Sequence, residues 1–286
     1  MITKKNSSSL TVHVAQMTAT EDVSRNEQQI FQLLEQVKSP GLVVFPENAL
    51  FLQIDPLERG SQPPDFSLRE PFFKKLQSFC KQKSSTIILG SVPFSGGAER
   101  LWNTMVKVTA DEAKPVYQKI HLFDVEVKGE KSLKESDTYA YGEAPRMEEI
   151  EGWLWGLSIC YDLRFSELYA YYRAQGAQAL LVPAAFLKTT GQAHWHTLLR
   201  ARAIENQCFV VAPAQAGQHV SSKTGRVRES FGHSLVIDPW GEILAEAQSL
   251  GPELFSVTLD SQRISEVRQQ IPMEEHRQKR LWKPPC

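Results

Sequence analysis

The sequence has few cysteines, no long apolar run and almost no net charge, and each shortage excludes a class of protein. Its four cysteines form no CxxC pair or other metal-ligand spacing, so the sequence predicts neither a disulfide-stabilised fold nor a zinc site. No window approaches the roughly 18 apolar residues that a membrane span requires, and the polar start MITKKNSSSL lacks the apolar core of a signal peptide. A formal net charge of -1 provides no concentrated basic surface for nucleic acid or an anionic membrane. We therefore expect a cytoplasmic protein whose ligand is a small molecule.

Linkers, low-complexity tracts and short repeats are also missing, and strand-like and helix-like segments alternate along the chain. This alternation predicts one α/β domain over residues 1–272, followed by a C-terminal tail at 273–286. The expected strands are 10–17, 41–47, 85–94, 102–110, 114–123, 149–160, 179–186, 208–217 and two strands around a DPWG turn at 238–241. The expected helices are 26–37, 69–83, 165–177, 194–207 and 261–271.

Three chemically useful side chains stand where apolar strands end: Glu47 in LVVFPEN, Lys119 in PVYQKIHLF and Cys160 in WLWGLSICYDLRF. In α/β sheets, ligand sites gather beyond the carboxyl ends of strands. Each residue alone has an ordinary explanation, because free cysteines are usually buried and charges at strand ends are usually solvated. Together they match the requirements of nucleophilic catalysis, since a cysteine nucleophile needs a base to accept its proton and a cation to stabilise the oxyanion. The chain passes from Cys160 directly into a helical segment, a position that favours a thiolate.

A Cys/His pair of the papain type is an alternative use of the same cysteine. The chain has seven histidines that could act as its base, and they include His121, His194, His196 and His233. The papain-type sequence around the cysteine is absent, which favours the carboxylate base over a histidine.

The segments VVFPENAL, YQKIHLFD and SICYDLRFSELY resemble, in this order, the three motif blocks of the nitrilase (carbon-nitrogen hydrolase) superfamily. The resemblance extends over roughly residues 10–272. It implies a four-layer α-β-β-α sandwich and a homodimer or higher homo-oligomer. The tail at 273–286, which contains the basic segment EEHRQKRLWKPPC, is a candidate for the dimer interface, although a frayed terminus explains it equally well. The resemblance calls for no metal or organic cofactor.

The resemblance also implies roles for individual residues. Glu47 would be the general base, Cys160 the nucleophile that forms a thioester with the acyl group, and Lys119 the stabiliser of the oxyanion. The backbone N–H of Tyr161 would be a second oxyanion donor. Glu135, in SLKESDTY, occupies the place of the family's second glutamate, which lies in the pocket; the alternative is a solvated loop charge.

Within the superfamily, CYDLRF and LLRARAIENQ most resemble the branch that contains deaminated glutathione amidases and omega-amidases. We therefore expect hydrolysis of a small 2-oxo-acid amide such as deaminated glutathione. The alternatives are 2-oxoglutaramate-like monoamides and a non-catalytic binding relative. Arg164 is a candidate for binding a substrate carboxylate, although an ion pair with Asp162 or Glu167 explains it equally well. Trp195 is expected in the core or the pocket wall.

Overall fold

A computed structural model describes residues 9–55, 62–98, 100–125 and 133–276 of the chain and contains two extended β-sheets. The first sheet has seven strands and the second has six. In spatial order, the first contains β17 (Glu253–Asp260), β1 (Ser9–Gln16), β2 (Leu42–Val44), β3 (Thr86–Phe94), β4 (Leu101–Val108) and β5 (Ala113–Gln118), with β8 (Tyr139–Ala140) beside β4. The second contains β16 (Ile243–Glu246), β15 (Leu235–Ile237), β12 (Phe209–Ala212), β11 (Ala179–Leu181), β10 (Trp153–Leu157) and β9 (Met147–Ile150).

Helices and two short hairpins complete the described part of the fold. The helices are α1 (Val23–Leu34), α2 (Glu70–Lys83), α3 (Ser166–Ala174), α4 (Lys188–Asn206), α5 (Ser261–Gln270) and α6 (Met273–His276), with 3-10 turns η1 (Phe66–Leu68), η2 (Glu135–Asp137) and η3 (Cys160–Arg164). The hairpins are β6 (Asp124–Val125) with β7 (Leu133–Lys134), and β13 (Ala216–Val220) with β14 (Val227–Phe231).

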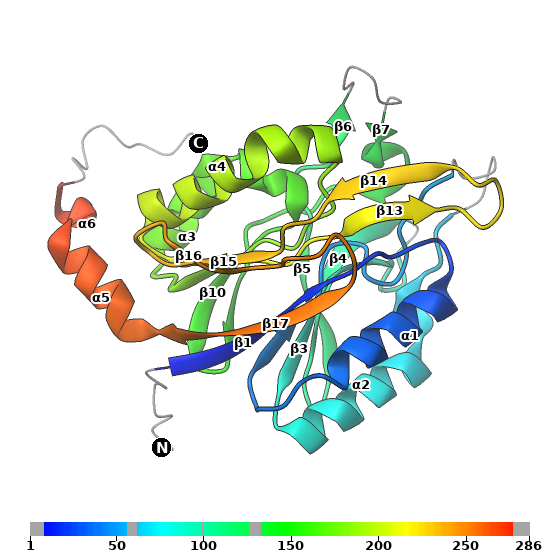
Figure 1. Cartoon of the computed structure of the whole chain (residues 1–286), viewed down its shortest axis with the longest axis horizontal. Helices are drawn as coiled ribbons and strands as arrows, with labels where there is room; N and C mark the ends of the chain where they lie inside the picture. Colours follow the sequence, from blue (N-terminus) through cyan, green and yellow to red (C-terminus); the bar gives the residue numbers. More distant parts are fainter. Residues whose placement is uncertain (1–8, 56–61, 99, 126–132, 277–286) are drawn as a thin grey trace.

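The two sheets pack face to face, and helices cover both outer faces (Figure 1). Val14 and Val44 of the first sheet share one buried cluster with Trp155 of the second. Val43, the neighbour of Val44, points the other way and joins a second cluster with Leu76 of α2. This alternation is what a strand with two buried faces produces. The layers therefore run α1/α2, first sheet, second sheet, α3/α4, and the predicted α-β-β-α sandwich is confirmed.

Local packing shows why α3 can lie directly on the second sheet. A Cβ atom added to Gly156 of β10 would stand 2.5 Å from the ring of Tyr172 on α3. The glycine thus allows the aromatic ring to sit against the strand backbone. The hydroxyl of Tyr172 donates to the backbone oxygen of Leu157, the last residue of β10. The end of this strand, just before Cys160, is consequently held in place from the helix layer.

Several of the expected elements differ from the structure. The expected strand at 208–217, for example, divides into β12 and β13, which belong to different sheets. The expected strand at 149–160 is wrong as a single strand, because the chain turns at Glu151 and Gly152, whose φ angles are 51° and 78°. Consecutive positive φ values make a tight hairpin turn that joins β9 to β10. The expected helix at 194–207 begins earlier, at Lys188. Its first turns include Gly191, where an added Cβ would lie 2.2 Å from Phe231, so this helix end packs closely on β14.

Five strands of the described chain lie outside the strands expected from the sequence, namely β6, β7, β8, β14 and β17. β17 pairs antiparallel with β1 along all eight of its residues and closes one edge of the first sheet. Its sequence, ELFSVTLD, alternates apolar and polar residues in the manner of a half-buried strand, so the signal was present. β14 pairs with β13 and carries charged residues, which obscure the alternation.

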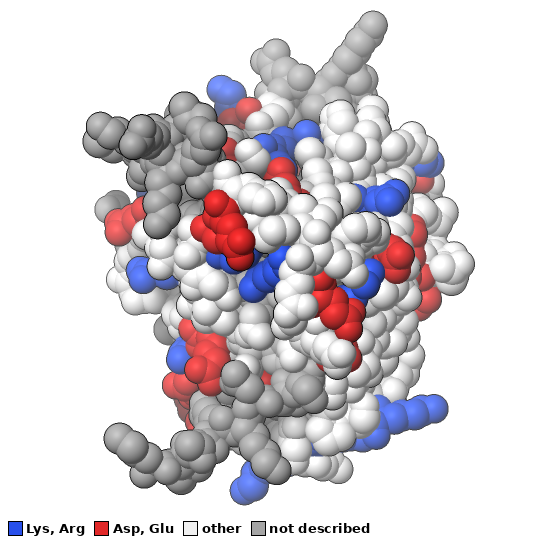
Figure 2. Space-filling model, turned by 90° about the vertical axis from the view of Figure 1, so that its left-hand side faces the viewer, with Lys and Arg blue, Asp and Glu red and all other residues white. Residues whose placement is uncertain are grey.

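The distribution of charged side chains on the described surface agrees with the small net charge of the sequence. Figure 2 shows the side of the molecule on which α5 lies, where basic and acidic side chains are interspersed and neither sign forms a large field. Among the described residues, no helix combines the length and the apolar character that crossing a bilayer requires.

Candidate active site

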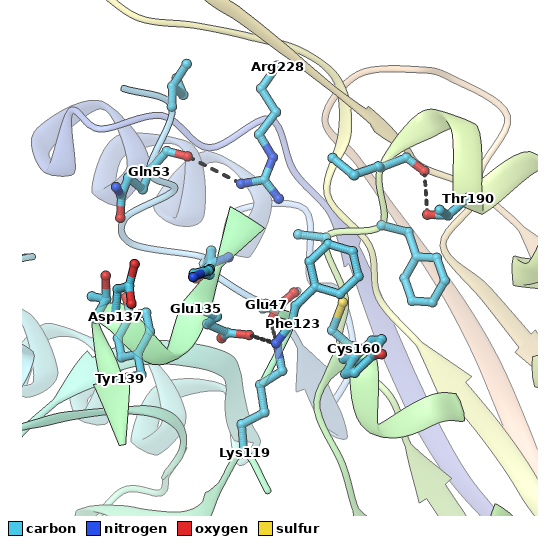
Figure 3. Close-up of a pocket in the computed structure, with 18 of the residues that line it drawn as sticks. Glu47, Gln53, Lys119, Phe123, Glu135, Asp137, Tyr139, Cys160, Thr190 and Arg228 are labelled. Carbon is cyan, nitrogen blue, oxygen red and sulfur yellow. Dashed lines mark hydrogen bonds and ion pairs between the residues drawn. The ribbon is translucent and has the colours of Figure 1, made fainter. Parts of the chain in front are cut away.

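A cavity of about 460 Å³ lies where the ends of strands from both sheets meet. Glu47 follows β2, Lys119 follows β5, and Cys160 follows β10, so the three predicted residues enter the cavity from different strands (Figure 3). Glu135, at the start of η2, lies beside them. Phe186, in the segment between β11 and α4, forms part of the opposite wall.

Lys119 stands between two carboxylates at the base of this cavity. Its Nζ lies 2.8 Å from Oε1 of Glu47 and 2.8 Å from Oε2 of Glu135, and only 2% of the lysine is exposed. Burial alone would lower the pKa of Lys119, but the charges of Glu135 and Glu47 raise it well above its ordinary value. The lysine is therefore a permanent ammonium ion at neutral pH.

Glu135 is held inside the cavity by several donors. The backbone N–H of Phe123 donates to its Oε2 at 2.7 Å, and the side-chain amide of Asn103 donates to its Oε1 at 2.8 Å. The side chain is 13% exposed. The alternative of a solvated loop charge thus does not describe Glu135.

Cys160 occupies a strained backbone position at the start of η3. Its φ angle is 49°, which is unusual for a residue other than glycine, and its N–H donates to the oxygen of Pro183 at 2.9 Å. Strain of this kind persists only where surrounding contacts enforce it, and it gathers at functional sites. The residue is 7% exposed and lines the cavity.

The protonation of Cys160 differs from the expectation of a resting thiolate. Burial raises the pKa of the Cys160 thiol well above its ordinary value, and the Glu47 carboxylate raises it further. The Lys119 ammonium and the N–H of Ala185 act in the opposite direction without reversing the shift. The helical segment after the cysteine is only the short turn η3, which contributes little dipole. At neutral pH the sulfur therefore carries its proton, with a carboxylate beside it that can accept it.

Tyr161 and Arg164 also line the cavity. The guanidinium of Arg164 lies over the rings of Tyr161 and Phe186, at 5.7 and 5.5 Å from their centroids, and its Nη1 is 3.3 Å from Nδ1 of His194. No described carboxylate forms an ion pair with it. Neither of the two proposed structural partners, Asp162 and Glu167, pairs with Arg164. Its guanidinium can therefore bind a ligand in the cavity.

Sequence reasoning considered Asp162 only as a partner of Arg164 and missed its actual place. Its completely buried carboxylate accepts hydrogen bonds from the hydroxyl of Tyr117 (2.7 Å), from both the N–H and the ring of His121 (2.9 and 2.7 Å) and from the N–H of Ile159 (2.9 Å). Tyr117 and His121 flank Lys119, and Ile159 precedes the cysteine. Asp162 therefore joins the segments that carry the ammonium and the thiol.

Asn103 of β4 is a second residue that was missed. Its side-chain amide donates to Glu47 at 3.1 Å and to Glu135 at 2.8 Å, and its backbone oxygen accepts from the N–H of Lys119 at 2.9 Å. It thus positions all three charged groups. The available signal was a polar residue inside the apolar strand LWNTMVKV.

None of the histidines among the described residues lines the cavity. His121 donates to Asp162, and His196 and His233 share the carboxylate of Glu246. The Cys/His alternative therefore has no support from the geometry. Trp195 is 1% exposed and packs on Phe186, behind the cavity wall.

The sequence and the fold are similar to those of known proteins. The family model described as carbon-nitrogen hydrolase matches residues 11–269. The deaminated glutathione amidase of Synechocystis sp. (strain PCC 6803 / GT-S) is 39% identical over 271 residues, which cover 92% of this chain and 96% of that protein. The crystal structure of the NitFhit protein of C. elegans has a TM-score of 0.80 at 32% identity, covering 96% of this chain and 66% of its own. Nit3 of Saccharomyces cerevisiae, a member of branch 10 of the nitrilase superfamily, has a TM-score of 0.73 at 27% identity, covering 98% and 99%.

Replacing Glu47 with glutamine should lower the pKa of Cys160, because a negative charge is removed while the Lys119 ammonium remains. The pH midpoint for alkylation of Cys160 by iodoacetamide, followed by peptide mass spectrometry, should move to lower pH. Glu143→Gln, which changes an exposed glutamate, should leave the midpoint unchanged. An equal or higher midpoint in Glu47→Gln would contradict the electrostatic coupling of the two side chains.

Replacing Asp162 with asparagine should destabilise the protein by about 1–3 kcal/mol, because an amide NH₂ then faces buried donors that need an acceptor. Urea denaturation of the variant measures this loss. Asp111→Asn is the matched control at an exposed turn and should change the unfolding free energy by less than about 0.5 kcal/mol. Equal stability of the two variants would show that the Asp162 network does not hold the two segments together.

Proposed function

The chain belongs to the carbon-nitrogen hydrolase family, and from this membership we propose that it hydrolyses a small 2-oxo-acid amide through a thioester on Cys160. As a member of the nitrilase superfamily with amidase relatives, it is an amidase, a hydrolase of carbon–nitrogen bonds other than peptide bonds. The observation that carries the proposal for the mechanism is the buried group formed by Cys160, Glu47, Lys119 and Glu135 in one cavity.

The reaction begins with transfer of the thiol proton of Cys160 to Glu47 as the sulfur attacks the amide carbon. The carbonyl oxygen becomes an oxyanion and is stabilised by the Lys119 ammonium and the backbone N–H of Tyr161. Glu47 then passes its proton to the leaving nitrogen, and the carbon–nitrogen bond breaks to leave a thioester on Cys160. Glu47 takes a proton from water, whose oxygen attacks the thioester, and the proton returns to the sulfur as the acid departs.

Glu135 keeps Lys119 in place throughout these steps. When Glu47 accepts the thiol proton it becomes neutral, and Lys119 would lose its only anionic partner if Glu135 were absent. A buried ammonium without a partner is costly and its pKa falls. Glu135 therefore acts by keeping the ammonium charged at the moment when the oxyanion needs it.

The relatives and the cavity support the proposed substrate class. The relative from Synechocystis is named as a deaminated glutathione amidase, and a 2-oxo-acid amide carries a carboxylate that suits Arg164. The volume of about 460 Å³ lies in the usual range for a small-molecule site, roughly 300–1,000 Å³. An omega-amidase acting on 2-oxoglutaramate-like monoamides is the second candidate, because the same guanidinium serves its substrate.

We propose that residues 1–272 form a single domain and that the protein assembles as a homodimer. Amide hydrolysis by the proposed mechanism requires no metal or organic cofactor. The tail at 273–286 is assigned to the dimer interface. Its first residues, 273–276, form α6, and residues 277–286 lie outside the described part of the chain.

Cys160→Ser should reduce ammonia or amine release by roughly a thousandfold or more, because an alcohol beside this base is a much weaker nucleophile. A panel of amides that includes deaminated glutathione and 2-oxoglutaramate identifies the substrate. Acid quenching of the unmodified enzyme during turnover should reveal, by intact mass, the acyl group on Cys160. Hydrolysis without that intermediate would refute the mechanism, and binding without hydrolysis of any amide would favour the non-catalytic relative.

Arg164→Met should raise KM for the carboxylated amide by roughly 10–100-fold, which corresponds to the loss of a charged hydrogen-bonded pair. Hydrolysis of a neutral amide of similar length should change little. Steady-state kinetics on both substrates make the comparison, and Arg25→Met, on the exposed face of α1, is the control. Equal losses on the two substrates would assign Arg164 to the structure of the cavity wall.

A further inference from the structure

Two histidines and a glutamate gather outside the cavity, on three different elements of the second half of the chain. His196 lies on α4, His233 lies between β14 and β15, and Glu246 ends β16. Their ligand atoms all lie within 4.8 Å of one another. None of them lines the cavity, so the chemistry described above does not use them.

The two imidazole rings point at the same carboxylate oxygen. Nε2 of His196 is 3.0 Å from Oε1 of Glu246, and Nδ1 of His233 is 2.5 Å from that same oxygen. Two imidazole nitrogens from different elements therefore approach one carboxylate oxygen.

The backbone holds His233 in this orientation. Its φ angle is 59° and that of Gly232 is 77°, so the chain turns sharply where β14 ends. The indole N–H of Trp195 donates to the backbone oxygen of His233 at 2.8 Å, and the imidazole stacks on Phe231 at 4.4 Å between centroids. A left-handed backbone at a residue other than glycine persists only where its surroundings enforce it. Two separate contacts and the turn of the backbone thus present the ring to Glu246.

The donor types select the ion. Imidazole nitrogens with a carboxylate suit zinc and its neighbours in the first transition row, whereas magnesium and calcium prefer ligands that are all oxygen. Zinc bonds of about 2.0–2.2 Å place tetrahedral ligand atoms about 3.3 Å apart. The ligand atoms here are separated by similar distances, since the two imidazole nitrogens lie 3.0 and 2.5 Å from the carboxylate oxygen and all three atoms lie within 4.8 Å of one another. The side chains of His196, His233 and Glu246 are 35%, 34% and 23% exposed, so an ion can enter and a water can complete the tetrahedron.

We propose that His196, His233 and Glu246 form a zinc site with water as the fourth ligand. On binding, the ion replaces the two N–H protons that now face Glu246, and each neutral ring carries its proton on the other nitrogen. The ion joins α4, the β14–β15 turn and β16. Because zinc binds only the folded arrangement, it raises the stability of the chain.

The test uses the full chain without a histidine tag and with Cys160→Ala, which removes the thiol of the cavity as a competing ligand. Titration of zinc chloride against a chromophoric chelator should reveal one equivalent bound with a micromolar or lower Kd. Thermal unfolding should occur at higher temperature with zinc than with EDTA, and magnesium chloride should have no such effect. Cobalt(II) should bind in the same place and give the visible absorption of a tetrahedral ion.

Single variants in the same background identify the ligands. His196→Ala and Glu246→Gln should each weaken zinc binding at least tenfold and remove the thermal shift, while His276→Ala, which changes an exposed histidine on α6, should bind as before. Circular dichroism and the Tm in EDTA verify that each variant is folded. His233→Gln serves if either of the first two does not fold. Zinc affinity that is millimolar, or that survives in the folded ligand variants, would overturn the proposal and leave the cluster as a hydrogen-bond network.

Discussion

The buried carboxylate of Asp162 is the interaction on which the arrangement of the cavity depends. It accepts hydrogen bonds from Tyr117 and His121, two positions on either side of Lys119, and from the backbone just before Cys160. β5 and β10 belong to different sheets and share no backbone ladder. The hydrogen bonds to this carboxylate therefore join the two segments. Breaking them would leave buried donors without an acceptor, which costs free energy. The carboxylate brings the ammonium and the sulfur into one cavity.

Charge balance is the second constraint on this cavity. Glu47 and Glu135 each carry one negative charge, Lys119 carries one positive charge, and the thiol of Cys160 is neutral at rest. In the proposed reaction the proton moves from sulfur to Glu47 while the negative charge moves to the substrate oxygen, so the total stays the same. A buried site that never changes its net charge avoids the large cost of burying an additional ion. The raised pKa of the cysteine is therefore compatible with catalysis, since deprotonation coincides with attack.

Much of the fold was predictable because its signals are local. Apolar runs such as 41–47 and 85–94 predicted strands that β2 and β3 confirm, and the DPWG turn at 238–241 separates β15 from β16 as expected. The predictions failed where a local pattern was ambiguous. The hairpin between β9 and β10 depends on two positive φ angles inside an apolar segment, and the start of α4 depends on the packing of Gly191 against β14. The start of α4 is therefore decided by a contact that lies outside the segment itself.

The candidate site divides in the same way. The sequence by itself determined that Glu47, Lys119 and Cys160 end strands in an α/β fold, because strand ends are marked by nearby residues and the motif blocks around them are local. Only the tertiary structure decided that Asp162 joins two sheets and that the cysteine keeps its proton. The tertiary structure alone brought His196 and His233 together around Glu246. Hydrogen bonds and charge effects depend on distances in space, and partners such as Tyr117 and Asp162, or His196 and Glu246, are 45 and 50 residues apart along the chain.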